Sequence, residues 1–223
     1  MQYIVTKKEM QAIDTYTIEK IGIPAEVLME RAALLLVEQI IHLNTMNGRI
    51  LIVVEGGNNG GDGLAAARIL SGRGYQVDIT YIGGIARPSE QFQLQRNILK
   101  QMGIRLRKTI PNKDYAVVVD GIFGVGLSRE IDGIQKKMIE YLNHMEAIKV
   151  AIDIPSGIDA TTGAILGIAF RADYTVTFGL KKLGMFFSDG IDYCGKVICE
   201  NIGFPENAIK QVKPQIYAYN QSD

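Results

Sequence analysis

Three short apolar runs constrain the fold of this chain more than any other feature of its sequence. They cover residues 50–54, 116–120 and 150–154, and each is continuous and rich in β-branched side chains. A strand of a parallel sheet shows this pattern because both of its faces are buried. Helix-like stretches alternate with these runs. The chain is therefore predicted to form an α/β fold, with a mostly parallel sheet and helices on both faces.

Local signals predict where the helices begin and end. Thr6 and Glu9 have the spacing of a capping box, and Gly22 is expected to end the helix that Thr6 begins. Pro24 suits the first turn of a second helix that runs to about residue 44. The apolar positions that support this second helix are Val27, Leu28, Leu35 and Ile41. Further helices are predicted at about 63–72, 89–102 and 133–146, and further strands at 76–82, 175–178 and 197–200.

The composition limits what the chain can do. Lys and Arg number 24 and Asp and Glu number 24, whereas a general nucleic-acid binder would need a basic excess. No apolar run approaches the roughly 20 residues of a membrane helix, and the first ten residues lack the apolar core of a signal peptide. Only Cys194 and Cys199 are present, which suits a reducing cytoplasm. Because the composition shows no linker-like shift, we expect one domain over residues 1–223, with no nucleic-acid or membrane partner.

The segment 55–63 follows the first apolar run and holds five glycines in nine residues. In parallel sheets ligands bind outside the carboxyl ends of the strands, where this segment begins. Glycine lets a backbone approach a ligand closely, and N–H groups at the start of the next helix can cradle an anion such as phosphate. Asn58, Asn59 and Asp62 add side-chain oxygens. The segment therefore predicts a phosphate cradle, with a purely structural turn as the alternative.

A second polar segment follows the second apolar run. Asp120 ends that run, and a buried carboxylate there would be costly unless it were paired or bound a cation. Beyond it, Gly124 and Gly126 open space for a ligand. Ser128 and Arg129 can hold phosphate, Arg129 in a bidentate manner. This segment is predicted to form a second wall of the binding site.

Asp153 lies near the end of the third apolar run, and Ser156 follows the run. Because the pattern G-x-S-x-G is absent, Ser156 is predicted to be a ligand rather than a nucleophile. Three adjacent strand ends would thus bring together oxygens of Asn59, Asp120 and Ser156. Such neutral or singly charged oxygens suit a weakly charged cation better than Mg²⁺, which takes more carboxylate or substrate phosphate.

Two weaker motifs point to other functions. Residues 61–66 fit G-x-G-x-x-A, with Asp78 at roughly the spacing of a dinucleotide-binding oxidoreductase, but a true fingerprint begins as the strand ends. Residues 190–196 have the glycine and lysine spacing of a P-loop, but Val197 stands where Ser or Thr would hold Mg²⁺. His42 and His144 lie far from any cysteine or glycine-rich turn, which disfavours a zinc site and a Ser-His-Asp triad.

Taken together, the motifs resemble the signatures of the NAD(P)H-hydrate epimerases. The resemblance rests on the run Gly57-Asn58-Asn59-Gly60-Gly61-Asp62-Gly63, on Asp120 followed by Phe123-Gly124 and Gly126-Leu127, and on Asp153-Ile154-Pro155-Ser156-Gly157. The segments 172–184 and 195–205 are also similar, so the resemblance runs from about Thr6 to Pro205.

Two positions depart from the family pattern. Glu55 and Gly56 stand where the family more often has a glycine and then a variable residue, which adds a carboxylate near the phosphate cradle. Lys181 precedes Lys182 where a proline is frequent. The sequence therefore leaves open which of these two lysines faces the site.

The resemblance implies a three-layer αβα, Rossmann-like domain that usually forms a homodimer. It implies interconversion of the R and S forms of NADHX and NADPHX, the C6-hydrated and damaged forms of the nicotinamide cofactors. It also implies a bound K⁺ held by Asn59, Asp120 and Ser156. The substrate contacts that it implies are Asn58, Asn59, Gly60, Gly61, Asp62, Gly124, Val125, Gly126, Leu127, Ser128, Arg129, Glu130 and Asp153.

In many bacteria such a domain is fused to an ATP- or ADP-dependent dehydratase that acts on the S form. Only about eighteen residues follow Pro205, so we expect either a separate dehydratase as the pathway partner or a chain cut from a longer fused protein.

Inversion at C6 requires a proton to move at an oxygen or a nitrogen of the substrate, whether the hydroxyl leaves as water and returns or the ring opens and closes. Asp153 is predicted to move that proton, since Asp120 is expected to hold the cation. Lys182 is predicted to steady a developing negative charge or to tune the carboxylate. Other relatives act as scaffolds in mRNA decapping or bind apolipoprotein A-I, but the presence of Asn59, Asp120, Asp153 and Ser156 favours the enzyme.

Overall fold

The computed structural model describes residues 2–83 and 87–218, and its centre is a sheet of seven parallel strands. The strand order is β4-β3-β2-β5-β6-β7-β9. Their bounds are β2 Ile50–Val54, β3 Val77–Tyr81, β4 Leu106–Arg107, β5 Val117–Gly121, β6 Ile148–Ile152, β7 Tyr174–Phe178 and β9 Lys196–Glu200. The predicted α/β fold with a mostly parallel sheet is confirmed.

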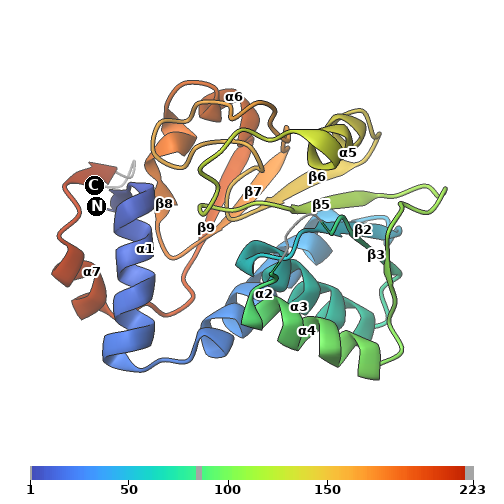
Figure 1. Ribbon diagram of the computed structural model, residues 1–223, viewed down its shortest axis with the longest axis horizontal. Coiled ribbons are helices and arrows are strands. Elements are labelled where there is room, and N and C mark those ends of the chain that lie inside the picture. Colours follow the sequence, from blue (N-terminus) through green and yellow to red (C-terminus); the bar gives the residue numbers. More distant parts are fainter. Residues whose placement is uncertain (1, 84–86, 219–223) are drawn as a thin grey trace.

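Helices cover both faces of this sheet, so the fold has three layers (Figure 1). The helices are α1 Lys7–Thr15, α2 Ala25–Leu43, α3 Asn58–Gly72, α4 Glu90–Gln101, α5 Gly133–Asn143, α6 Gly190–Tyr193 and α7 Glu206–Val212. A π-helical turn, η1 Tyr16–Ile21, continues α1, and a 3₁₀ turn, η2 Leu183–Phe186, follows the short strand β8 Lys181–Lys182. No helix of the described ranges is both long and apolar enough to cross a bilayer.

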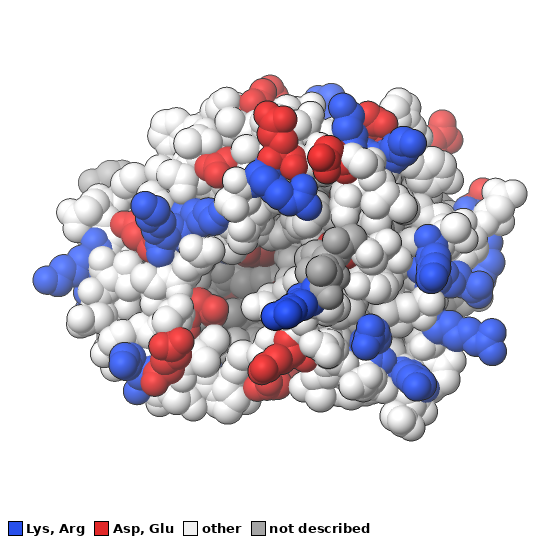
Figure 2. All heavy atoms as spheres, in the orientation of Figure 1, with Lys and Arg blue, Asp and Glu red and all other residues white. Residues whose placement is uncertain are grey.

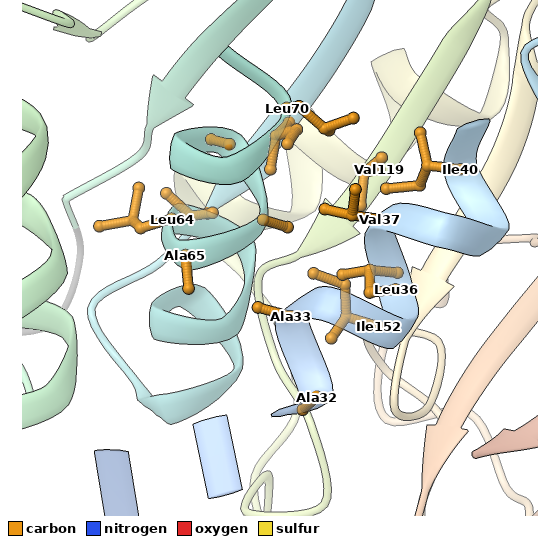
Figure 3. Close-up of a cluster of buried hydrophobic side chains, with 14 of the residues drawn as sticks. Ala32, Ala33, Leu36, Val37, Ile40, Leu64, Ala65, Leu70, Val119 and Ile152 are labelled. Atoms are coloured by element: carbon orange, nitrogen blue, oxygen red, sulfur yellow. The ribbon is translucent and has the colours of Figure 1, made fainter. Parts of the chain in front are cut away.

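The pleat of β2 explains why its apolar run is unbroken. Ile50, Ile52 and Val54 point into the core under α2 and α3, whereas Leu51 and Val53 point into the core on the α5 side. Figure 3 shows side chains of α2 and α3 meeting Val119 and Ile152 of the neighbouring strands. A sheet buried on both faces needs apolar residues at every strand position, and this need produced the strongest signal in the sequence.

The sequence prediction was wrong about where α3 begins. The helix starts at Asn58 rather than near residue 63, so most of the predicted glycine loop is its first turns. A Cβ on Gly60 would lie 1.8 Å from the carbonyl oxygen of Glu55, which only glycine avoids. The glycines therefore let α3 begin directly at the end of β2 rather than forming a long loop.

The second helix is confirmed, but of its four predicted apolar positions Leu35 and Ile41 are only partly buried and Val27 is exposed. Val27 is 47% exposed, whereas Leu28 is buried in the core. The buried face of α2 repeats through Leu28, Ala32, Leu36 and Ile40, at helical spacing. Val27 precedes this face by one residue and points away from it.

A second, three-stranded sheet was not predicted. It has the order β10-β1-β8, with β1 Gln2–Val5 and β10 Ile216–Ala218. The N-terminal strand pairs with β8, and Val5 lies opposite Lys182. Both ends of the described chain therefore lie side by side in this sheet (Figure 1). Through this pairing, the N-terminal segment is attached next to Lys182.

Candidate active site

One cavity, of about 830 Å³, opens over the carboxyl ends of the central strands. The chain runs from β2 outward to β3 and β4, and then returns to β5 on the other side of β2. Ligands of open α/β sheets bind at such a switch point, because the connections there diverge and leave a crevice. Figure 2 shows the molecule hollowed at this place, between the α1 side and the side of α2 to α4. The volume is typical of small-molecule sites.

The N-terminus of α3 forms one wall of this cavity. Gly57 is the N-cap residue and makes no side-chain cap, so the first N–H groups of α3 are available to an anion. Asn58, Asn59 and Asp62 line the cavity. Gly60 and Gly61 do not line it, because they lie behind the wall against Glu55 and Met29.

The segment after β5 forms a second wall. The predicted contacts on it that line the cavity are Gly124, Val125, Gly126, Leu127, Ser128 and Arg129, whereas the exposed Glu130 is outside the lining. Lys7, at the start of α1, donates from Nζ to the carbonyl oxygen of Leu127 at 2.6 Å. Arg129 is 58% exposed, and its guanidinium lies 3.7 Å from Asp132 and donates to the Glu130 carbonyl oxygen at 3.1 Å, contacts at the surface that a ligand could replace.

Asp120 and Ser156 are joined directly below the cavity floor. The Asp120 carboxylate accepts from Ser156 N at 2.8 Å and from Ser156 Oγ at 2.7 Å, and also from Ile122 N. Ser156 Oγ in turn accepts from Phe123 N at 2.8 Å. Burial raises the pKa of Asp120 to about 6, although these hydrogen bonds act in the opposite direction. The pair therefore fixes the loop after β5 to the loop after β6.

The donor set at this place suits a monovalent cation. The buried amide of Asn59 has an Nδ2 without a hydrogen-bond partner among the described residues. A Cβ on Gly124 would lie 3.1 Å from the Asn59 amide, so only glycine leaves this space next to Asn59. No cluster of three His, Cys, Asp or Glu residues able to hold a metal exists within the described ranges. The oxygens of Asn59, Asp120 and Ser156 carry one formal negative charge, which fits a singly charged ion.

Asp153 and Lys182 form a buried ion pair that borders the cavity. Lys182 is 1% exposed, and its Nζ donates to Asp153 Oδ1, to Thr177 Oγ1 at 2.8 Å and to the Phe178 carbonyl oxygen at 3.0 Å. Lys182 rather than Lys181 therefore faces the site. Asp153 is 14% exposed, and both members of the pair line the cavity.

The backbone of Asp153 is strained. Its φ is +66°, a conformation that residues with a side chain rarely adopt. Thr177 Oγ1 donates to the carboxylate at 3.1 Å, and the N–H of Phe178 donates at 3.3 Å. Strain of this kind persists where surrounding contacts fix it, and it concentrates at functional sites.

Two further carboxyl groups lie near this ion pair. Burial, followed by the negative charges of Asp153 and Asp14, raises the pKa of Asp62 well above its ordinary range. Burial and the charge of Asp153 also raise the pKa of Asp14, which Lys182 lowers in part. Asp14 was missed by the sequence analysis. The sequence feature that could have indicated Asp14 is a carboxylate on the helix face that also holds Met10, Thr17 and Ile18.

Glu55 does not contribute a carboxylate to the phosphate cradle. Its side chain is fully buried, and it accepts from Gln135 Nε2 of α5 at 3.1 Å and from Gly56 N at 3.1 Å. Glu55, which departs from the family pattern, therefore connects the end of β2 to α5. It does not form part of the cavity wall.

Comparisons with known proteins agree on one family. A family profile described as YjeF-related protein N-terminus matches residues 25–184. A protein of Leuconostoc citreum named NAD(P)H-hydrate epimerase is 41% identical over 200 residues, which are 90% of each chain. A protein of Weissella koreensis with the same name is 40% identical over 95% of this chain and 97% of its own. The crystal structure of the yeast protein YNL200c has the same fold, with a TM-score of 0.78 at 20% identity over 99% of this chain and 97% of the yeast chain.

We predict that Ser156→Ala lowers the free energy of unfolding by about 1–3 kcal/mol, because it removes one of the three donors to the buried Asp120 carboxylate and leaves the Phe123 N–H without a partner. Urea unfolding measures the change. Ser128→Ala is the matched control, since Ser128 is exposed on the neighbouring loop and its loss should change stability by no more than about 0.5 kcal/mol. Equal stability of the two variants would mean that the Asp120–Ser156 link does not hold the loops together.

Proposed function

The chain belongs to the family described as YjeF-related protein N-terminus, and we propose that it is an NAD(P)H-hydrate epimerase that interconverts the R and S forms of NADHX and NADPHX. One observation of the site supports this proposal most directly. A single cavity combines an anion-binding helix N-terminus with a carboxylate that a buried lysine holds in place. The substrate requires both, since it has a pyrophosphate and a carbon centre whose inversion needs a proton to move at the attached oxygen or nitrogen.

The two ends of the cavity bind different parts of the substrate. The pyrophosphate binds the first N–H groups of α3 and the segment of Gly124 to Arg129, where dipole and guanidinium favour negative charge. The hydrated nicotinamide ring then lies toward Asp153 and Lys182. The apolar side chains of Met29, Phe178 and Phe204 also line the cavity, and they exclude water from the ring.

Asp153 moves the proton of the hydroxyl group that C6 carries. Its carboxylate is partly exposed to the cavity, whereas the carboxylate of Asp120 is fully buried and engaged by Ser156 and Ile122. Lys182 donates to one carboxylate oxygen and holds it in place, and the second oxygen is left to the substrate. This arrangement serves both chemical routes, because each requires one proton to move at the hydroxyl oxygen.

A K⁺ ion held by Asn59, Asp120 and Ser156 would supply a fixed positive charge near the substrate phosphates. The support for it is the chemistry of the oxygen donors, which are one amide, one carboxylate and one hydroxyl group. Asp120 and Ser156 position the loop that carries Gly124 to Arg129, so these residues orient the substrate without moving its proton.

The product of one direction is the S form, which a separate ATP- or ADP-dependent dehydratase would consume. We place both activities in the cytoplasm, where the free thiols of Cys194 and Cys199 are stable, and we expect the epimerase to act as a homodimer.

We predict that this protein lets a purified S-specific dehydratase consume all of a mixed R/S sample of NADHX. Without it, the dehydratase should remove the S fraction quickly and leave the R fraction to spontaneous epimerisation. Loss of the hydrate absorbance and gain of NADH absorbance measure the process. The assignment fails if the R fraction drains no faster when the protein is added.

We also predict different defects for Asp153→Asn and Asp120→Asn. Asp153→Asn should lower kcat by about 10²–10⁴-fold with little change in K⁺ dependence, because it removes the proton-moving group, and it should also lower the melting temperature, because it leaves the buried Lys182 ammonium without its anionic partner. Asp120→Asn should weaken K⁺ binding, and high K⁺ should restore part of its activity. A K⁺ titration of kcat, with a thermal melt of each variant, separates these effects. Near-normal kcat in Asp153→Asn, with Asp120→Asn inactive at every K⁺ concentration, would reverse the two roles.

A further inference from the structure

Three carboxyl groups and one ammonium group line the same cavity, and only one of the carboxyls is paired with the ammonium. Asp14, Asp62 and Asp153 all line the cavity, as does Lys182. Their charges act on one another, since Asp153 raises the pKa of both other carboxyls and Lys182 lowers it. Three carboxylates and one ammonium would carry two net negative charges, and burial of such charge is unfavourable. The cluster is therefore suited to holding an exchangeable proton.

Asp14 reaches this cluster from a separate element, the N-terminal helix. Met10, Asp14 and Ile18 line the cavity at a spacing of four residues, so one face of α1 and η1 forms a cavity wall. The position of this wall is fixed at its start. Val5 pairs with Lys182, the Thr6–Glu9 capping box begins the helix, and Lys7 donates to the Leu127 carbonyl oxygen.

No structural partner accounts for the Asp14 carboxyl. Within the described residues, no hydrogen bond or ion pair holds its side chain, although the group is partly buried. A carboxylate of this kind costs stability and adds nothing to packing. Exposed carboxylates of the same helical segment, such as Glu19, do not line the cavity. The placement of Asp14 is therefore best explained by contact with a ligand.

Epimerisation can use a second acid/base group, because the reaction takes place on both faces of the ring. The hydroxyl at C6 must be present on one ring face before the reaction and on the other afterwards. Asp153 approaches the cavity from the end of β6, whereas Asp14 approaches it from α1. We propose that Asp14 is a second acid/base residue of the reaction, which exchanges a proton with the substrate from the α1 side while Asp153 does so from the sheet side. This inference rests on the proposed epimerase function.

The proton balance closes for both routes. In the water-loss route, the protonated Asp14 carboxyl gives its proton to the C6 hydroxyl as the C6–O bond breaks, and the N1 electron pair forms the C6–N1 double bond. Water then adds to C6 from the other face and gives a proton to the Asp153 carboxylate, and exchange of one proton with solvent returns Asp153 to its ionised form and Asp14 to its protonated form. In the ring-opening route, Asp153 takes the hydroxyl proton as the C6–N1 bond breaks, and Asp14 protonates N1. The reverse step on the other face restores both groups.

The test compares Asp14→Asn, Asp14→Ala and Glu19→Gln with the wild type in the dehydratase-coupled assay. Asp14→Asn should lower kcat by about 10²–10⁴-fold with little change in KM, and Glu19→Gln should match the wild type. Formate should restore part of the activity of Asp14→Ala, because it supplies a carboxyl group in the space left by the side chain. A residue with a merely structural role would not respond to formate. Thermal melts of each variant confirm that the fold is kept.

The inference alone would be overturned by wild-type kcat in Asp14→Asn, or by a folded Asp14→Ala whose lost activity formate does not restore. A loss confined to KM would also overturn it, since it would make Asp14 a binding residue. An inactive wild type would instead overturn the proposed function, and the proposed role of Asp14 would then be wrong as well.

Discussion

The buried ion pair between Lys182 and Asp153 is the interaction on which the site depends. A lysine ammonium that is 1% exposed must recover its lost hydration from the protein, and it does so through Asp153, Thr177 and the Phe178 carbonyl oxygen. These partners come from the end of β6 and from β7, and Lys182 itself lies on β8. Because β8 pairs with β1, the same lysine connects the central sheet to the N-terminal strand and hence to α1. Removal of one partner would leave a buried charge unpaired and would loosen the wall that carries Asp14.

Asp120 and Asp153 look alike in the sequence, since each follows an apolar strand, but the structure gives them different surroundings. The carboxylate of Asp120 has no exposed surface and is held by its own loops. The carboxylate of Asp153 keeps an opening to the cavity and is held on a strained backbone. A group that anchors loops or a cation is best enclosed, whereas a group that moves a proton must touch the substrate. The division of roles between them follows from this difference in access.

The sequence predicted the central strands β2, β5 and β6 well because a continuous apolar run marks each of them. It failed where distant contacts decide the structure. Glycines are poor helix formers, so residues 58–62 were taken for a loop, but close packing against the end of β2 makes them helical. The strand β1 has four residues and gains its partners from the far end of the chain, so no local pattern could reveal it. Asp14 depends on that strand for its position, and it was missed for the same reason.

The most direct test of the central claim needs no second enzyme. Pure S-NADHX and pure R-NADHX are each incubated with the protein in a K⁺ buffer, and the two epimers are separated by chromatography over time. We expect both samples to reach the same R/S ratio, much faster than in buffer alone, and we expect Asp153→Asn to return them toward the spontaneous rate. If both samples stay at the spontaneous rate with the wild-type protein, the cavity does not catalyse epimerisation and the account is wrong.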